Sequence, residues 1–287
     1  MKRLDIDLVR KKILRNFRDF ILIDKIPFRF FLSNLFVNLL RVNNEFVVGC
    51  IEGFNIPLQL SDPIQRQIYF GLYEQPETKL LREKLPETGI FIDVGANVGY
   101  FSLLASALIG KGGSVHTFEP IPKNLQVLVD AIESNKISNI VTNQVAIGRK
   151  KGTIELFIND TEMGNASSII GPNRKKAVIA PIITLGDYIE ISEINQVDFI
   201  KIDIEGGEFD ALLGMEKILR HKIAPDLIVE INPYFLQRNG VAPSIILEML
   251  SDFGYKYYKI LNSGVLLEVD LQNSLDELCN IYCTKRY

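Results

Sequence analysis

Short apolar segments alternate with segments of helical length from residue 90 onward, and this alternation limits the chain to few folds. Two of the apolar segments, IFIDV at residues 90–94 and DLIVEI at residues 226–231, hold few polar side chains. Strands of this composition are buried on both faces, and strand–helix alternation places them in a parallel sheet between two layers of helices. The sequence therefore predicts an α/β fold built on a doubly wound, mostly parallel sheet.

Residue periodicity also assigns the individual elements. Strands are expected at residues 90–94, 114–118, 140–146, 197–202, 227–231, 255–261 and 280–284, and helices at 99–109, 123–134, 185–191, 209–219 and 244–253. Residues 153–158 and 177–182 are expected to form an inserted hairpin or a pair of edge strands. Earlier in the chain, helical segments are expected at residues 4–22, 27–41 and 61–85, the last broken near Gly71 and Pro76, with two short strands between residues 45 and 56. We therefore divide the chain into an extension of helices and strands, residues 1–60, and a main domain, residues 61–287.

Basic residues gather in the extension. Residues 1–44 hold ten Lys or Arg and four Asp, an excess of +6, while the whole chain carries −3. A body that is acidic overall argues against a nucleic-acid partner. A basic arm can touch a membrane surface or another chain, so peripheral membrane binding or self-association through residues 1–60 is one hypothesis. A solvated helix face packed on the body is the simpler interpretation.

Cysteine content bears on the compartment. The three cysteines, Cys50, Cys279 and Cys283, do not make a disulfide framework, and no nearby His completes a zinc site. A reducing cytoplasm is therefore expected. No secretion signal is evident, and the apolar run at residues 31–40 is too short to span a bilayer, which needs about 20 residues.

The strongest local motif is the glycine turn in FIDVGANVGYFS, residues 91–102. Gly95, Ala96, Asn97 and Gly99 turn the chain from a strand into a helix, where a ligand can approach the backbone closely. The dinucleotide motif G-x-G-x-x-G places its second glycine where Asn97 stands here. Asp93, two residues before the turn, would repel a pyrophosphate but suits the ammonium group of a methionine moiety. The motif favours S-adenosylmethionine over NAD.

A second acid marks the end of the next strand. Glu119 closes the segment VHTFEP and lies 24 residues after Gly95. A carboxylate at this position can accept hydrogen bonds from both hydroxyls of a ribose. The alternative is an acid exposed to solvent at a strand end, and the spacing favours the ribose.

A third group of charges lies in DFIKIDIEGGEFDAL, residues 198–212. Lys201 and Asp203 sit in or just after an apolar strand, so Asp203 needs a partner there: a ligand, a metal ion or Lys201. Glu205 and Glu208 precede a helix, whose N-terminus favours acids; Glu208 is expected to be structural, whereas Asp203 and Glu205 are open between a structural and a catalytic role. Glu230 ends a further strand, and it would share a crevice with Asp203 if the two strands are neighbours.

These residues resemble a known family. FIDVGANVGYFS, HTFEPIPKN, NQVAIG and FIKIDIEGGE, preceded by QIYFGLYEQPE, are similar to segments of the FkbM methyltransferases, in the same order, over about residues 67 to 260. The resemblance implies a class I, Rossmann-like sheet of about seven strands that binds S-adenosylmethionine. It also implies methyl transfer, usually to a hydroxyl oxygen of a sugar, polyketide or other secondary metabolite. The expected partner is thus a small-molecule or glycan acceptor.

The resemblance assigns roles by motif position. Asp93, Gly95, Asn97 and Gly99 would meet the methionine part, with Ala96 beside them; Glu119, followed by Pro120, would meet the ribose; Ala146 would lie near the adenine. Asp203 and Glu205 would face the transferred methyl group, with Lys201 keeping Asp203 ionised. If Asp203 and Glu205 shared one divalent cation, their oxygens would suit magnesium or calcium. A protein that binds the cofactor without catalysis, in a binding or assembly role, is the alternative.

Overall fold

The structure is a computed structural model of the chain. It describes residues 2–22, 28–42, 46–159, 162–167, 174–269 and 275–286. Its helices are α1 (Lys2–Ile21), α2 (Arg29–Leu40), α3 (Pro63–Tyr69), α4 (Gln75–Lys84), α5 (Tyr100–Ile109), α6 (Pro122–Asn135), α7 (Leu185–Ile191), α8 (Glu208–Leu213), α9 (Glu216–Leu219), α10 (Pro233–Arg238) and α11 (Pro243–Asp252). Its strands are β1 (Phe46–Ile51), β2 (Phe54–Gln59), β3 (Ile90–Val94), β4 (Ser114–Phe118), β5 (Ile140–Asn143), β6 (Ala146–Ile147), β7 (Gly152–Asn159), β8 (Glu162–Ser167), β9 (Arg174–Ile183), β10 (Phe199–Ile202), β11 (Asp226–Ile231), β12 (Lys256–Ile260), β13 (Leu266–Glu268) and β14 (Cys279–Thr284).

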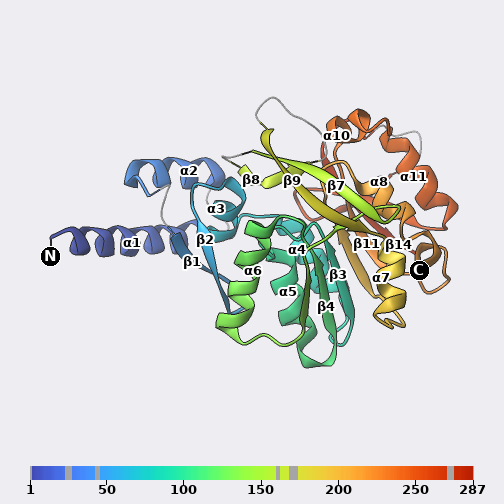
Figure 1. Cartoon of the computed structure of the whole chain (residues 1–287). Helices are drawn as coiled ribbons and strands as arrows, with labels where there is room; N and C mark the ends of the chain where they lie inside the picture. The colour runs from blue at the N-terminus through green and yellow to red at the C-terminus, as the bar shows by residue number, and fades with distance from the viewer. Residues whose placement is uncertain are drawn as a thin grey trace.

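The central sheet has the order β13-β12-β14-β11-β10-β3-β4-β5 (Figure 1). The five strands from β11 to β5 are mutually parallel, and β14 runs antiparallel to both β11 and β12. The strand order reverses between β3 and β10, and ligands in open α/β sheets bind at the carboxyl ends of strands at such a point. The expected doubly wound, mostly parallel sheet is confirmed.

Helices cover both faces of this sheet. Successive residues of a strand point to opposite faces, so Phe91 packs into a core with α5 and α6, while Ile92 packs into a second core with α8 and α11. Phe199 and Ile200 of β10 divide in the same way. This explains why the strands that the sequence marks as almost wholly apolar lie in the middle of the sheet.

Two expected elements are divided in the structure. The strand expected at residues 140–146 is wrong as one element: β5 joins the central sheet, and β6 pairs with β9 in a separate sheet. The helix expected at residues 209–219 breaks at Gly214 into α8 and α9. A Cβ on Gly214 would lie 2.1 Å from the carbonyl oxygen of Gly148, so a close backbone contact requires the glycine where the helix ends. Strands β8 and β13 and helix α10 were not expected.

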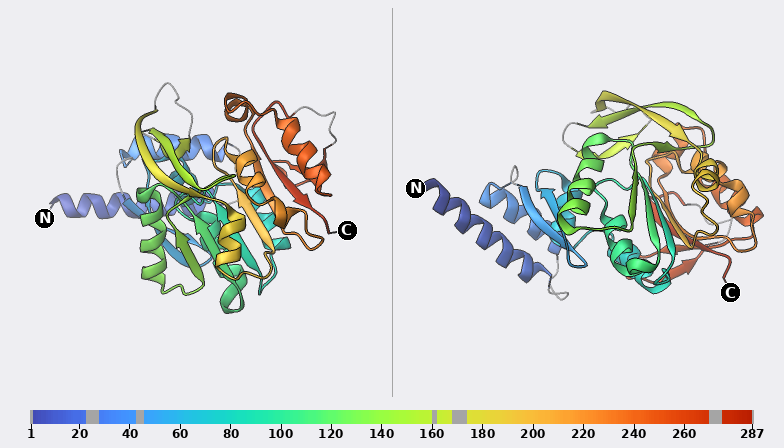
Figure 2. Two further views of the ribbon diagram at one scale, coloured as in Figure 1. Left: turned by 45° about the vertical axis from the view of Figure 1, so that its right-hand side comes forward. Right: turned by 60° about the horizontal axis from the view of Figure 1, so that its bottom comes forward.

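The two strands expected in the insertion are β7 and β9, which pair antiparallel along most of their length although β8 lies between them in the chain. With β6 and β8 they form a sheet of order β6-β9-β7-β8. Figures 1 and 2 show this sheet lying across one end of the central sheet. Ile154 and Leu156 of β7 belong to the lining of the cavity described below, so the insertion forms one of its walls.

The extension continues into the body rather than forming a core of its own. Leu14, Val37 and Ile56 are fully buried and belong to the same apolar cluster as Phe91 and Leu103. The side chain of Asn135 in α6 bonds the backbone of Asn55 in both directions, which ties β2 to the main domain. The division at residue 60 therefore does not separate two cores, although α1 and α2 project from the body (Figures 1 and 2). Within the described residues, no helix is long and apolar enough to cross a membrane.

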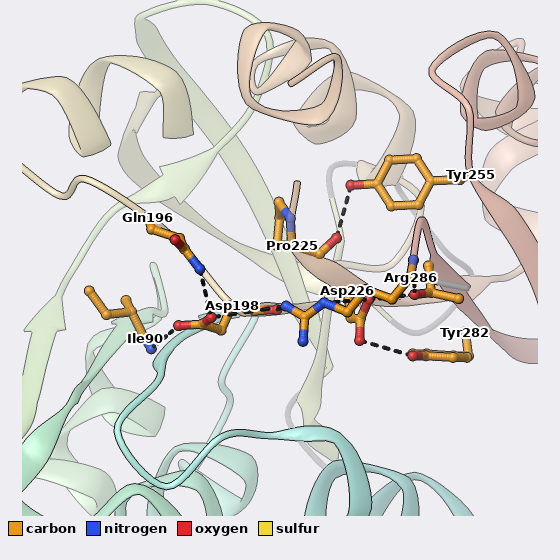
Figure 3. Close-up of polar contacts among 9 residues, drawn as sticks. Ile90, Gln196, Asp198, Pro225, Asp226, Tyr255, Tyr282 and Arg286 are labelled. Carbon is orange, nitrogen blue, oxygen red and sulfur yellow. Dashed lines mark hydrogen bonds and ion pairs between the residues drawn. The ribbon is translucent and has the colours of Figure 1, made fainter. Parts of the chain in front are cut away.

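A network of hydrogen bonds and ion pairs connects residues at the amino-terminal ends of the parallel strands, the edge of the sheet opposite the glycine turn (Figure 3). Asp198 accepts a hydrogen bond from the backbone N–H of Ile90 at 2.9 Å, and Asp226 accepts one from the Tyr282 hydroxyl at 2.9 Å. Arg286 lies within ion-pair distance of both aspartates, at 3.9 and 3.7 Å. These two acids therefore bond to groups of the fold itself.

Candidate functional site

The turn after β3 brings three strand ends together. Gly95 has φ +86°, and a Cβ there would lie 1.9 Å from the carbonyl oxygen of Asp203, so only glycine fits. The N–H groups of Gly95 and Ala96 both donate to the carbonyl of Phe118, at 2.9 and 3.1 Å. Asn97 is also left-handed, with φ 53°, a conformation that Asn tolerates better than most residues. The turn thus joins the carboxyl ends of β3, β4 and β10.

Gly99 differs from the other motif residues because it does not line the cavity. It has φ +87°, and a Cβ there would lie 2.5 Å from the side chain of Leu128 in α6. Its observed role is to let α5 begin close against α6, so any effect on a ligand acts through the position of the turn.

Glu119 is buried at the end of β4 and faces the glycine turn. Its two carboxylate oxygens accept hydrogen bonds from the backbone N–H groups of Asn97 and Ile121, at 2.8 and 2.9 Å. Burial raises the pKa of Glu119 to about 7, although these backbone hydrogen bonds oppose the rise. The alternative, an acid exposed to solvent at the strand end, is thus excluded, and the carboxylate also holds the turn in place.

Asp93 is buried within β3 and accepts a hydrogen bond from the Ser102 hydroxyl at 2.6 Å. Burial raises its pKa to about 6, against the opposing effects of Ser102 and Lys201. A positively charged ligand would offset the cost of burying this carboxylate.

A cavity of about 340 Å³ opens at the carboxyl ends of β3, β4, β10 and β11. Ten of the site residues expected from the sequence line it: Asp93, Gly95, Ala96, Asn97, Glu119, Pro120, Ala146, Lys201, Asp203 and Glu205. The remaining walls are largely apolar and aromatic, and include Ile64, Ile68, Tyr73, Tyr100, Phe101, Phe118, Phe235 and Leu278. A mostly apolar cavity with a few converging charges is the usual form of a small-molecule site.

Lys201 is the centre of a charge network in this cavity. Its side chain is only 3% exposed, and its Nζ lies 2.7 Å from Asp203 Oδ2 and 3.3 Å from Glu74 Oε2. The ammonium also lies 4.6 Å from the centre of the Phe101 ring. Burial alone would lower the pKa of Lys201, but the carboxylates of Asp203 and Glu74 raise it above its usual value. Of the three partners considered for Asp203, Lys201 is the one that the structure places beside it.

The loop after β10 separates the roles of its two glutamates. Glu208 is fully buried, and its Oε1 accepts from the N–H groups of Ile204 and Gly206, at 3.1 and 3.0 Å. Glu208 therefore has the structural role expected of it. Glu205 has φ 55° and lines the cavity, so the loop holds it in an unfavourable backbone conformation at the site.

Two further acids complete the cavity. Glu230 lies there with Asp203, as expected if their strands are neighbours, and β10 and β11 do pair. Burial, with Asp203 and Glu205 nearby, raises the pKa of Glu230 well above its usual value. Glu74 was not singled out from the sequence; it precedes α4 with φ 35°, and burial raises its pKa to about 7. Its only signal was its place in QIYFGLYEQPE, because no strand pattern leads to it.

The donors do not fit a divalent cation shared by Asp203 and Glu205. Asp203 Oδ2 already contacts the ammonium of Lys201 at 2.7 Å, so a second cation beside it would meet a fixed positive charge. Among the residues that the structure describes, no three His, Cys, Asp or Glu side chains form a group that could hold a metal ion. We assign no step to a metal.

Comparison with known proteins defines the class. The family described as Methyltransferase FkbM domain matches residues 93–257. The match includes the glycine turn and every acid named in the cavity except Glu74, which lies before it. The chain is therefore an S-adenosylmethionine-dependent methyltransferase by family. It belongs to the FkbM methyltransferase family.

Similar proteins share limited sequence with it. Methyltransferase 1 of Beauveria bassiana (strain ARSEF 2860) is 23% identical over 193 residues, 55% of this chain and 77% of that protein. The hexuronic acid methyltransferase AglP of Haloferax volcanii is 23% identical over 179 residues, 62% of this chain and 68% of that protein. The crystal structure of an FkbM methyltransferase from Methylobacillus flagellatus KT aligns with a TM-score of 0.45 and 20% identity, covering 77% of this chain and 54% of that one. The chain thus spans about half the length of that solved protein.

Proposed function

We propose that the chain transfers the methyl group of S-adenosylmethionine to a hydroxyl oxygen of a sugar, glycan or secondary metabolite. The observation that carries this proposal is the carboxylate of Asp203, which lines the cavity where β10 ends and touches the buried ammonium of Lys201. A hydroxyl has a high pKa, so its methylation benefits from a positioned base, and Asp203 is our candidate.

The cofactor would lie along the glycine turn. Asp93 would pair with the ammonium of its methionine part beside Gly95, Ala96 and Asn97, and Glu119, next to Pro120, would accept from the ribose hydroxyls. Ala146, which follows β5, would lie against the adenine. All of these residues line one cavity, which supports the arrangement.

The chemistry is an in-line displacement. A lone pair of the acceptor oxygen forms a bond to the methyl carbon as the carbon–sulfur bond breaks, and the bonding pair stays on sulfur as a neutral thioether. The hydroxyl proton passes to the carboxylate of Asp203. Lys201, already protonated, accepts no proton; its ammonium, 2.7 Å from Asp203 Oδ2, fixes the position of the carboxylate. Glu205 borders the same space and would orient the acceptor.

The charge of the cavity favours an acceptor without negative charge. Among its described lining, six carboxyl side chains (Glu74, Asp93, Glu119, Asp203, Glu205 and Glu230) accompany one basic side chain, Lys201, which is already paired. Like charges brought together at a binding site cost several kcal/mol. The hexuronic acid methyltransferase among the similar proteins supports a sugar acceptor, but this cavity favours a neutral sugar over its uronate.

A matched set of acceptors tests the proposal. We would compare methyl glucoside, its uronic acid and its uronamide, which differ at one carbon, and follow transfer of a labelled methyl group. We expect the two neutral sugars to exceed the uronate in kcat/KM by about tenfold or more, and the product to be an ether that resists mild base. A base-labile methyl ester, or preference for the uronate, would contradict the proposal.

Glu119→Ala should weaken cofactor binding. Hydrogen bonds to a charged group contribute about 1.5–3 kcal/mol, so the affinity for S-adenosylmethionine should fall by roughly tenfold or more. Because the buried N–H groups of Asn97 and Ile121 lose their acceptor as well, Glu119→Gln is the control that keeps one acceptor oxygen. Calorimetric titration with S-adenosylhomocysteine measures both variants, and thermal shift with NAD should show no stabilisation. Unchanged affinity would mean that Glu119 only supports the turn.

Cofactor affinity should rise with pH. The pKa values of Asp93 and Glu119 are raised to about 6 and 7, so both carboxyls are largely protonated in the empty chain at low pH. A cationic ligand favours the ionised carboxylate of Asp93, so binding releases protons and weakens as pH falls through this range, by up to about tenfold per pH unit for each proton released. The raised pKa values of Asp93 and Glu119 also affect folding of the chain without cofactor. Their contribution to the stability of the folded state is fully present below the ordinary carboxyl pKa, and it is lost as pH rises through 6 to 7. Titrations in two buffers of different ionisation heat count the protons, and an affinity independent of pH would contradict the assignment.

A further inference from the structure

The outer face of α2 carries a stripe of exposed apolar side chains. Phe28, Phe31, Leu35 and Leu39 are 80, 63, 43 and 69% exposed and recur at helical spacing. The inner face buries Ser33 and Val37. An exposed apolar stripe of this length on a helix is normally covered, by protein or by lipid.

Helix α1 repeats the pattern beside it. Val9, Ile13 and Phe20 are about half exposed and lie on one face, next to the buried Leu14 and Ile21. The ring of Phe17 stacks on Phe36 of α2 with centroids 3.6 Å apart, so the two helices form one layer, which projects from the body (Figures 1 and 2). The layer thus presents apolar side chains from both of its helices.

Basic residues accompany these stripes. Lys11, Lys12, Arg15 and Arg41 are exposed on the same two helices and their end. On α1, Lys11, Lys12 and Arg15 occupy the arc between the buried residues and the exposed apolar stripe, so basic side chains flank that stripe, as in helices that lie in the headgroup region of a bilayer. The excess of +6 within residues 1–44 would set two copies of this layer against each other. An anionic lipid surface complements both the charge and the apolar stripes.

We propose that the α1–α2 layer docks the enzyme on an anionic lipid surface, with Phe28, Phe31 and Leu39 immersed and the basic residues at the phosphate level. The layer also reaches the catalytic body. Phe17 lies 6.1 Å from the ring of Phe70, directly after α3, and α3 supplies Ile64 and Ile68 to the cavity wall. Docking would therefore bring the bilayer beside the helix that borders the acceptor space.

The test is flotation of the full chain with vesicles. We expect binding to phosphatidylcholine vesicles that contain phosphatidylserine, weaker binding to phosphatidylcholine alone, and loss of the difference at high salt. The triple variant Phe28→Ser, Phe31→Ser, Leu39→Ser should lower partitioning at least about 30-fold, because three immersed apolar side chains are replaced by hydroxyl groups. Lys11→Glu with Lys12→Glu should lower it at least about tenfold, since two positive charges that would face the lipid phosphates become negative.

A matched control removes exposed apolar side chains from the body. Ile191 and Ile223 are 82 and 64% exposed, and changing both to Ser should leave flotation unchanged. All variants replace surface residues, so melting temperatures and S-adenosylhomocysteine binding should be retained. Equal binding to both vesicle types, no flotation at all, or a dimer in solution that the triple variant dissociates would each overturn the proposal. The last result would show that a second copy covers this face.

Discussion

Asp203→Asn should lower turnover by about 10²–10⁴-fold, the usual contribution of a general base, while S-adenosylmethionine affinity changes little. The amide keeps the size of the side chain and a hydrogen-bond acceptor for Lys201, but it cannot take the acceptor's proton. Lys201 keeps Glu74 as a counter-charge at 3.3 Å, so the buried ammonium is still paired. We therefore expect the melting temperature to hold. Single-turnover methyl transfer and calorimetric binding, measured on the same preparation, separate chemistry from binding.

The matched control is Asp210→Asn, which changes an exposed aspartate of α8 whose nearest basic group, Arg149, lies 3.7 Å away. Its activity should equal that of the wild type. Full turnover by Asp203→Asn would show that Asp203 is not the base. Glu74 would then be the candidate base, because its pKa of about 7 also suits proton transfer. A variant that fails to fold would instead assign Asp203 to the structural ion pair, a result that Lys201→Met paired with Asp203→Asn would check.

Gly95→Ala should have the largest effect on the fold. The new Cβ would lie 1.9 Å from the carbonyl oxygen of Asp203, a backbone atom that cannot move without parting β3 from β10. We expect a loss of more than about 4 kcal/mol in the free energy of unfolding, within the range of severe steric changes, together with loss of cofactor binding. Chemical denaturation measures the first and calorimetry the second.

Gly53→Ala separates backbone strain from steric overlap. Gly53 has φ +88°, almost the value of Gly95, and a Cβ there would meet nothing within 4 Å. Its substitution should cost only about 1–2 kcal/mol, the usual penalty for a left-handed residue with a side chain. If the two variants lost equal stability, the close approach of β3 and β10 at Gly95 would not be the reason for the glycine.

The parts of the site that follow directly after strands could be predicted from the sequence. The pattern predicted the apolar strands β3, β10 and β11, and the carboxyl ends of parallel strands share one edge of a sheet. That rule is enough to bring Asp93, Glu119, Asp203 and Glu230 into one cavity. Lys201 lies in β10 and Asp203 directly follows it. Residues two apart in a strand point to the same side, so this spacing makes Lys201 a possible partner of Asp203.

Glu74 shows where this reasoning ends. It lies in a loop before α4, far from Lys201 in the chain, and only the packing of α4 beside the sheet brings its carboxylate to the ammonium. The division of residues 140–147 has a similar origin. The N–H of Glu119 donates to the carbonyl of Asn143, where β5 ends, and the next residues pair with Ile182 and Ile183 instead. Apolar periodicity is the same for both strands, so it cannot show that they belong to different sheets.

Local sequence by itself therefore determined the class of fold, the glycine turn and the acids at strand ends, because strand and helix periods and left-handed backbone positions depend on neighbouring residues. Tertiary structure alone decided which distant groups meet. It places the backbone of Gly95 against Asp203 and that of Gly99 against Leu128, and it leaves the apolar stripe on the outer face of α2 exposed. A helical pattern specifies which residues share a face, whereas the burial of that face depends on what the rest of the chain places against it.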